Sequence, residues 1–437
     1  MKYNRLFAVC LAVVMLASLL SGCALATKNT QRDNDRVLAV VNGQEIRKIE
    51  FSGLWEIYKN YYASQYGDLS SDDPAVQYTV RNLKQETFDN FVQSIIILQK
   101  AKELGFDALS EEDQNSAMET YESIIQSNYD SYAGRYAELL EIDPDFDAEA
   151  AGKQDFIDYL AQEGRTPESM QQDYLDNAAK TALQQSIQDS IEISDEEIQS
   201  YYDKLLLAQQ LSYDFDSTAE ENEEAKQARD AAVEAAGLSA TPSFANDYDA
   251  DGAMILYYPD TRAVLVTHIL IEMEQEDKDK YNEAYSLYAG EELEQILEEA
   301  YTRIKPKAEE ALAKVEAGED FEELIKTYGA DAGQLNYLER GGYVVTADSN
   351  QVEPFKAAAL ALKKVGDHTG LVQTTYGYHI IMLNEILPQK EVVPLGEFEE
   401  QIRTQLASEK SAALWEEKVA QWVEEAEIEL YEDVLFS

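Results

Sequence analysis

The spacing of apolar residues predicts a helix-rich first half that opens with a short pair of strands. Residues 36–44 alternate loosely between apolar and polar and end at Asn42-Gly43, a turn signal that predicts a β-hairpin. From residue 48 to 206 apolar side chains recur mostly every three or four positions, which is the spacing of amphipathic helices. Ser194, with the acidic residues that follow it, is typical of a helix N-cap.

The second half alternates between strand-like and helix-like patterns. Apolar runs predict strands at 254–258, 263–271 and 378–383. Helical spacing occurs at 280–317, 321–328 and 352–362. We therefore expect a small α+β domain here. The stretch 207–260 is acidic and rich in small residues, which favours a linker or insertion with one short helix near 223–236.

The C-terminal segment predicts one more helix. After Pro394 a sustained apolar stripe includes Trp415 and Trp422. Because a stripe of that width is unfavourable in water, we expect it to dock on the N-terminal helices. The N-terminal domain would then be discontinuous in sequence.

The charge balance excludes one class of function. The chain has 85 acidic and 35 basic residues and a formal net charge of -50, spread along its length, which excludes nucleic-acid binding. The simplest interpretation is a surface kept soluble by its own charge, and the alternative is attraction of cationic clients or cell-wall cations. Because no carboxylate spacing resembles a calcium loop, we expect no metal site.

The N-terminus has the layout of a signal peptide. Basic residues precede an apolar run at 6–20, which closes on the tetrapeptide LSGC at 20–23. This tetrapeptide resembles the lipobox of bacterial lipoproteins, which implies lipidation of Cys23 and attachment to the extracytoplasmic face of the cell membrane. The alternative is an ordinary cleaved signal that leaves the protein free. The other cysteine, Cys10, lies inside the signal, so the mature chain has no disulfide partner.

Three segments of the α+β half resemble the parvulin family of peptidyl-prolyl isomerases. They are VTHILI at 266–271, GEDFEEL followed by YGAD within 318–331, and TTYGYHII at 374–381. A fourth segment, PFKAAA at 354–359, is similar to the start of a family helix. Their order and spacing agree with the family. The resemblance implies a parvulin-like domain that isomerises X-Pro bonds without cofactor or metal.

The resemblance also assigns catalytic roles to residues of this chain. It implies that His268 and His379 are paired imidazoles on the floor of the site. Asp331 would be the neighbouring polar residue, and Thr374 the hydroxyl that bonds between them. The third histidine, His368, matches no family position.

The substrate side departs from the family in places. The resemblance makes Phe355 the main wall of an apolar slot for the proline ring, with Gln351 and Tyr376 as further substrate-binding residues. The family usually has methionine at the position of Gln351, and the match at 343–346 is loose, which bears on catalytic efficiency. The loop 272–277 is acidic where phosphate-selecting parvulins are basic, so we expect no phospho-specific isomerisation.

The opening VLAVVNGQEI at 37–46 is similar to that of SurA- and PrsA-type chaperones. This resemblance implies an α+β multidomain fold: a helix-rich SurA/PrsA-like chaperone domain, built from an N-terminal segment plus the C-terminal helix, with an inserted parvulin-like α+β domain. The expected parts are a lipoprotein signal peptide at 1–22, a tether at 23–35, the N-terminal helical chaperone domain at 36–206, the acidic linker at 207–260, the parvulin-like domain at 261–388 and the docking C-terminal helix at 389–437.

Two functions remain open at this point. The first is a membrane-anchored foldase that isomerises X-Pro bonds in unfolded or partly folded exported proteins. The second is an ATP-independent holding chaperone whose parvulin-like domain has weak or no turnover. A solute-binding lipoprotein would show a two-lobed α/β pattern, which this sequence lacks. The oligomeric state stays open, a homodimer included.

Overall fold

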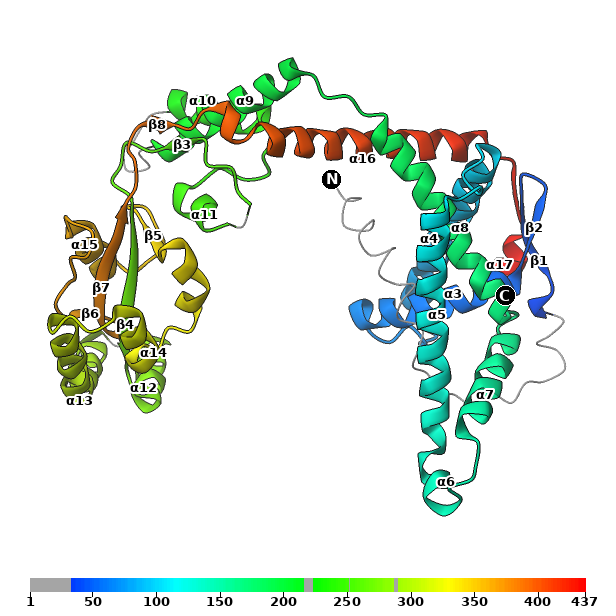
Figure 1. Ribbon diagram of the computed structural model, residues 1–437, viewed down its shortest axis with the longest axis horizontal. Coiled ribbons are helices and arrows are strands. Elements are labelled where there is room, and N and C mark those ends of the chain that lie inside the picture. The colour runs from blue at the N-terminus through cyan, green and yellow to red at the C-terminus, as the bar shows by residue number, and fades with distance from the viewer. Residues whose placement is uncertain (1–32, 216–222, 251, 287–289) are drawn as a thin grey trace. The chain divides into compact units, whose positions relative to one another are not determined.

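The computed structural model describes residues 33–215, 223–250, 252–286 and 290–437 (Figure 1). The expected signal peptide at 1–22 and the lipidation site Cys23 lie outside these residues. The chain forms two compact units: Met1–Glu192 together with Ala407–Ser437, and Ile193–Leu406. Within the described ranges, none of the helices combines the length and apolar character of a membrane span.

The first unit opens with the expected hairpin. Strands β1 (Val37–Val41) and β2 (Gln44–Arg47) pair in antiparallel fashion. The turn residues have φ angles of 49° at Asn42 and 81° at Gly43, which are the positive values of a tight hairpin turn. A third strand, β9 (Ile428–Leu430), pairs with the other edge of β1. The sequence pattern did not predict β9, because three residues are too few to show alternation.

Helices make up the rest of this unit. They are α3 (Lys48–Tyr66), α4 (Pro74–Glu103), α5 (Glu111–Ala133), α6 (Ala137–Ile142), α7 (Ala148–Gln162), α8 (Pro167–Asp189) and the short α17 (Glu432–Leu435). Phe51 of α3 and Phe88 of α4 share one core with Trp415 and Val419 from the C-terminal helix α16 (Glu399–Glu425). The apolar stripe of α16 is therefore buried, as its pattern predicts.

The boundary between the units differs from the expected one at residue 206. Helix α9 (Asp195–Tyr213) begins at the predicted cap, where Ser194 and Glu197 exchange side-chain to backbone hydrogen bonds. Ile198 and Leu205 of this helix pack against Leu256 and Ile402. Because that buried face belongs to the second unit, the compact units divide after Glu192.

The acidic stretch that precedes the sheet also folds onto the second unit. It contains α10 (Glu223–Ala235) and α11 (Phe244–Asp249). A strand was predicted at 254–258, but only Tyr257–Tyr258 forms one, β3, paired with β8 (Glu391–Val392). The buried side chain of Gln209 bonds to the backbone on both sides of Leu256 and so occupies groups that a strand partner would need.

The core of the second unit is a four-stranded antiparallel sheet in the order β5-β4-β7-β6. Its strands are β4 (Val264–Glu272), β5 (Tyr343–Val345), β6 (Val372–Thr374) and β7 (Gly377–Ile386). Figure 1 shows β4 and β7 side by side in the middle of this sheet. These central strands bring the two candidate histidines into one sheet.

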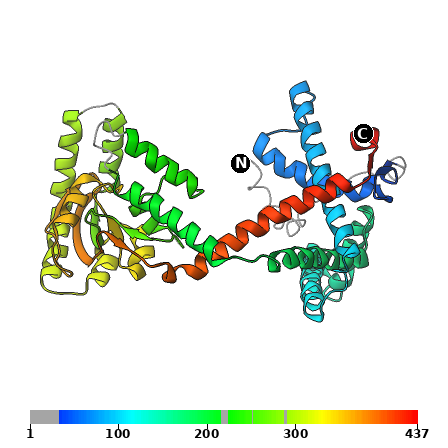
Figure 2. The same cartoon turned by 90° about the horizontal axis from the view of Figure 1, so that it is seen from above.

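Helices cover both faces of this sheet. They are α12 (Gln275–Ser286), α13 (Gly290–Glu316), α14 (Phe321–Tyr328), the 3-10 helix η3 (Gly333–Arg340) and α15 (Glu353–Ala361). The single stretch expected at 280–317 is thus two helices, visible as neighbours in yellow-green in Figure 2. An ion pair between the buried Asp277 of α12 and the exposed Arg303 of α13 joins them. Helices α13 and α14 cover one face, and α15 covers part of the other.

Candidate functional site

Two imidazoles meet on the face of the sheet that α15 partly covers. His268 lies on β4 and His379 on β7, on neighbouring central strands. Their ring centroids are 5.0 Å apart and their planes are inclined by 56°. Both side chains are buried. The structure therefore brings together the pair that the sequence resemblance singled out.

Phe355 completes a triangle of rings with the two histidines. Its ring lies edge-on to His268 and to His379, with centroid distances of 5.2 Å in both cases. Phe355 stands in the first turn of α15, where Pro354 occupies a favourable N-terminal position. Only 3% of the Phe355 side chain is exposed, so an apolar wall is present and closely packed.

Thr374 anchors His379 from the neighbouring strand β6. The Thr374 hydroxyl and Nε2 of His379 are 2.8 Å apart, and the backbone N–H of Tyr376 donates to the same hydroxyl at 3.1 Å. Both bonds lie on the His379 side of the pair. The side chain of Tyr376 is 56% exposed. Gly377 has a φ of 143°, and a Cβ there would lie 2.1 Å from the carbonyl oxygen of Ile271, so the tight turn requires glycine.

Asp331 lies beside the other histidine. The N–H of Ala330 donates to the carbonyl of Leu270 at 3.0 Å, which ties this loop to β4. Oδ2 of Asp331 is 3.4 Å from Nε2 of His268, close but without an aligned hydrogen bond. Oδ1 of Asp331 accepts from the backbone N–H groups of Gly333 and Gln334, at 3.0 and 3.3 Å.

Gln334 supports His268 and was not predicted from the sequence. Its side-chain oxygen accepts from the N–H of His268 at 2.6 Å, and its amide nitrogen donates to the carbonyl of the same residue at 2.8 Å. Strand β5 pairs with β4 only as far as Val266. The amide of Gln334 therefore takes the place of the missing strand at His268 and leaves its backbone satisfied.

Tyr343, the first residue of β5, is a second unpredicted neighbour. Its hydroxyl donates to Oδ2 of Asp331 at 3.0 Å. Its ring lies nearly parallel to that of His268, at a centroid distance of 6.0 Å and an inclination of 21°. The only sequence signal was the position itself, inside the segment 343–346 that matched the parvulin pattern loosely.

Burial keeps both imidazoles neutral. It lowers the pKa of His268 to about 4, against the opposing effect of the Asp331 carboxylate. It lowers the pKa of His379 to about 3, and the neighbouring His268 adds to this shift. Within the described residues, Nδ1 of each ring makes no hydrogen bond. The two rings thus form a buried, uncharged pair with unpaired polar atoms, beside the Asp331 carboxylate.

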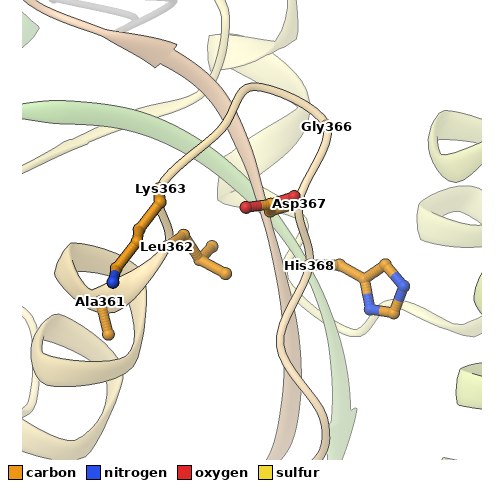
Figure 3. Close-up of a pocket in the computed structure, with 6 residues that line it drawn as sticks. All are labelled: Ala361, Leu362, Lys363, Gly366, Asp367 and His368. Carbon is orange, nitrogen blue, oxygen red and sulfur yellow. The ribbon is translucent and has the colours of Figure 1, made fainter.

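Gln351 contacts the backbone of β5, and His368 lies at a separate hollow. The amide of Gln351 donates to the carbonyl of Val344 at 3.2 Å, and its oxygen is buried with no hydrogen-bond partner in the described structure. His368, which matched no family position, lines a different, open hollow of about 530 Å³ (Figure 3). Figure 3 shows this hollow bounded by Leu362, Lys363 and Asp367 as well.

The site combines two neutral imidazoles, an apolar ring and two polar groups. In the part of the chain that the structure describes, no group of three or more His, Cys, Asp or Glu side chains is placed to hold a metal ion. Neutral rings and an apolar wall can accept a hydrophobic ring and exclude water from it. A hydroxyl and a carboxylate at the edges supply fixed polar groups.

Two family models match the chain. Residues 2–151 match a model described as SurA-like N-terminal domain. Residues 268–385 match a model described as PPIC-type PPIASE domain. The second match begins at His268 and includes every residue of the ring triangle.

Among curated proteins, the chain is similar to sequences named Foldase protein PrsA. The protein from Clostridium botulinum strain Langeland is 29% identical over 177 residues, which cover 38% of this chain and 50% of that protein. The chain thus spans about half the length of the first curated relatives it matches. The protein from Clostridium acetobutylicum is 21% identical over 436 residues, which cover 98% of both.

Similar solved structures include PrsA from Bacillus subtilis and a SurA-like chaperone of Campylobacter jejuni. The Bacillus protein is 16% identical, with a TM-score of 0.21 and coverage of 90% of this chain and 93% of that chain. The Campylobacter protein is 18% identical, with a TM-score of 0.25 and coverage of 91% and 100%.

Proposed function

We propose that this chain, a PrsA- and SurA-like protein with a PPIC-type domain, is a peptidyl-prolyl cis-trans isomerase that acts as a foldase on exported proteins. The observation that carries the proposal is the triangle of His268, His379 and Phe355, whose rings lie 5.0 to 5.2 Å apart on one face of the sheet. All three residues lie within the segment 268–385 that matches the PPIC-type model.

The reaction makes and breaks no covalent bond. A prolyl imide must twist against a barrier of about 18 to 20 kcal/mol, which is slow enough to limit folding. Twisting removes the amide resonance, so the imide nitrogen becomes more basic and the carbonyl loses charge. A water-poor pocket that fits the twisted form better than either planar form lowers the barrier.

In this site apolar and polar side chains have different proposed roles. Phe355 is the proposed apolar wall for the proline ring. The imidazoles of His268 and His379 form the floor of the proposed site. They carry no charge at neutral pH, because burial holds their pKa values far below neutrality. The hydrogen bond between Thr374 and His379 keeps that floor in one orientation.

The test is a protease-coupled proline peptide assay on the chain from residue 24. We expect His379→Ala to lower kcat/KM by at least about tenfold while the protein stays folded by circular dichroism. His368→Ala is the matched control, because it removes the histidine outside the ring triangle. A wild-type rate equal to the uncatalysed rate would rule out the enzyme.

A second candidate, a holding chaperone with little turnover, is favoured by the substrate side of the site. Phe355 is only 3% exposed, and Gln351, where the family usually has methionine, donates its amide to the carbonyl of Val344. This candidate predicts normal suppression of aggregation of an unfolded client and no difference between wild type and His379→Ala in the peptide assay. The two assays together therefore separate the candidates.

The proposed place of action is the outer face of the cell membrane. The tetrapeptide at 20–23 and the apolar run before it support lipidation of Cys23 after signal cleavage. We expect the protein in the membrane fraction of the producing cell, a diacylglycerol mass on the peptide that begins at Cys23, and release into the medium for Cys23→Ala. Cys10→Ala is the matched control, since it changes the other cysteine and leaves the cleavage site intact.

The proposed partners are unfolded or partly folded exported chains. The net charge of -50 favours polypeptides with basic segments over acidic ones. Binding of two unfolded model proteins of similar length and opposite net charge, at low and high salt, measures this preference. Equal affinities at low salt would contradict it.

A further inference from the structure

Tyr343 connects to the candidate site through a single carboxylate oxygen. Its hydroxyl donates to Oδ2 of Asp331 at 3.0 Å. The same oxygen lies 3.4 Å from Nε2 of His268. The ring of Tyr343 also runs nearly parallel to the His268 ring. One tyrosine therefore touches both members of the carboxylate–imidazole pair.

The backbone fixes where this tyrosine stands. In the antiparallel register Tyr343 lies opposite Val266, so the two side chains share the face of the sheet that carries His268. Gly342, just before it, has a φ of 105°, and a Cβ there would lie 2.1 Å from the carbonyl oxygen of Val266. The chain can approach β4 this closely only with glycine, which sets the start of β5 and the position of Tyr343.

The carboxylate is held at both of its oxygens. Backbone N–H groups of Gly333 and Gln334 bind Oδ1 of Asp331, and the Tyr343 hydroxyl binds Oδ2. Without the hydroxyl, Oδ2 has no hydrogen-bond donor among the described residues, and the carboxylate is free to turn. Burial and the neighbouring carboxylate both raise the pKa of Tyr343, so its hydroxyl keeps its proton and donates at neutral pH.

We propose that Tyr343 is a positioning residue of the isomerase site: its hydroxyl holds Oδ2 of Asp331 toward Nε2 of His268 and thereby fixes the orientation of that imidazole beside His379. The proposal rests on the proposed function. It assigns no contact between Tyr343 and the prolyl substrate, so the hydroxyl acts through Asp331 and His268 alone.

The kinetic test uses the chain from residue 24 with Tyr343→Phe, Asp331→Asn and the double variant. We expect Tyr343→Phe to lower kcat by about 5- to 10-fold with KM changed by less than about twofold, since the residue orients and does not bind substrate. The double variant should match Asp331→Asn within about twofold, because both changes break one chain of contacts. A full additive loss would overturn the proposal.

Tyr337→Phe is the matched control. Tyr337 packs against Tyr343 at a centroid distance of 4.8 Å but makes no hydrogen bond to Asp331 in the described structure. It removes one phenolic hydroxyl from the same stack of rings. We expect its kcat and KM within about twofold of wild type. An equal loss in both phenylalanine variants would overturn the proposal by assigning the effect to ring packing.

A second readout does not depend on turnover. The full sequence has three histidines, so ring-nitrogen NMR signals can be assigned by single substitutions. Tyr343→Phe and Asp331→Asn should shift the His268 ring-nitrogen signals in the same direction, while Tyr337→Phe leaves them in place. Unchanged His268 signals in Tyr343→Phe would overturn the inference even with reduced kcat. If wild type shows no turnover, the proposed function fails, and these spectra still test the inference separately.

Discussion

The two faces of the four-stranded sheet are built from alternate residues of the same strands, yet they serve different ends. On one face Ile269 and Ile380 pack with Ile304 of α13 in an aliphatic core. On the other face the adjacent residues His268 and His379 present imidazoles with unpaired nitrogens. Successive residues on either strand thus alternate between side chains that pack in the core and side chains of the candidate site.

The difference teaches how the fold can hold an unfavourable site. Buried polar atoms without partners destabilise a protein, by about 1 to 3 kcal/mol each in mutational data. On the face that α13 and α14 cover, close-packed aliphatic side chains offset this destabilisation. Each contributes about 1.5 to 3 kcal/mol when fully buried. Close packing on one side of the sheet therefore stabilises the unpaired polar atoms on the other.

The largest expected effect comes from breaking the covered face. Ile380 is fully buried, and Ile380→Ala should lower the free energy of unfolding of the second unit by about 2 to 5 kcal/mol, through lost burial and the cavity left behind. The rate per folded molecule should stay near that of wild type. Urea unfolding followed by circular dichroism measures the first quantity and the peptide assay the second.

The neighbouring substitution supplies the contrast. His379→Ala should leave stability within about 1 kcal/mol of wild type, since it also removes a buried, partly unpaired polar group, and should remove most of the turnover. All three tryptophans, Trp55, Trp415 and Trp422, lie in the first unit, so their fluorescence is an internal control for that unit. A larger loss of stability in His379→Ala than in Ile380→Ala would contradict the comparison.

Acid should weaken the site face next. The pKa values of His268 and His379 lie at about 4 and about 3 in the folded protein, below the usual 6.5, so the unfolded chain binds protons that the native state does not. Stability is therefore present above pH 6.5 and falls as the pH drops toward 4. At pH 4.5 we expect a loss of about 1 to 3 kcal/mol for each imidazole relative to pH 7, at about 1.4 kcal/mol for each pKa unit.

Substitution isolates this contribution from that of the many carboxylates. The difference in unfolding free energy between pH 7 and pH 4.5 should shrink by about 1 to 3 kcal/mol in His379→Gln. His368→Gln, outside the ring triangle, should keep the wild-type difference. Equal pH profiles for wild type and His379→Gln would show that the imidazole titrates alike in both states.

Local chemistry explains what the sequence predicted well. The Asn42-Gly43 turn and the Ser194 cap depend on a few adjacent residues, and both formed as expected. The histidine pair was found through motifs whose order along the chain matched a known family. The turn and the cap are each complete within a short segment, whereas the histidine pair needed the order of several segments along the chain.

Two buried glutamines show what the sequence could not reveal. Gln209 and Gln334 each bond to the N–H and C=O groups of a strand-like segment and replace a strand that is absent there. Glutamine is mostly exposed in proteins, so neither residue stood out in the sequence. Their roles depend on where β3 and β5 begin, which tertiary packing decides. Tyr343 was missed for the same reason.

A smaller effect is expected from the hydroxyl that orients His379. Thr374→Val keeps the shape of the side chain but removes the 2.8 Å bond to Nε2 and the acceptor for the Tyr376 N–H. We expect a loss of about 1 kcal/mol in stability and about threefold in kcat/KM. Thr374→Ser keeps the hydroxyl and should recover most of both. Unchanged kinetics in Thr374→Val would mean that packing alone orients the imidazole.

Gln351→Met is expected to have the smallest effect on stability. It also tests whether Gln351 borders the proposed proline slot. The substitution removes a buried oxygen that lacks a partner, which is favourable, and a 3.2 Å bond to the carbonyl of Val344, which is unfavourable. The two effects oppose each other, so stability should change by less than about 1 kcal/mol. If Gln351 borders the proline slot, the apolar thioether should raise kcat/KM by about two- to threefold. Gln373→Met is the control. Gln373 precedes Thr374 on β6, so its side chain points to the opposite face of the sheet, and the substitution should leave kcat/KM unchanged. No rise in Gln351→Met would place the amide outside the proposed proline slot and would leave the rings of His268, His379 and Phe355 as the proposed contacts of the substrate.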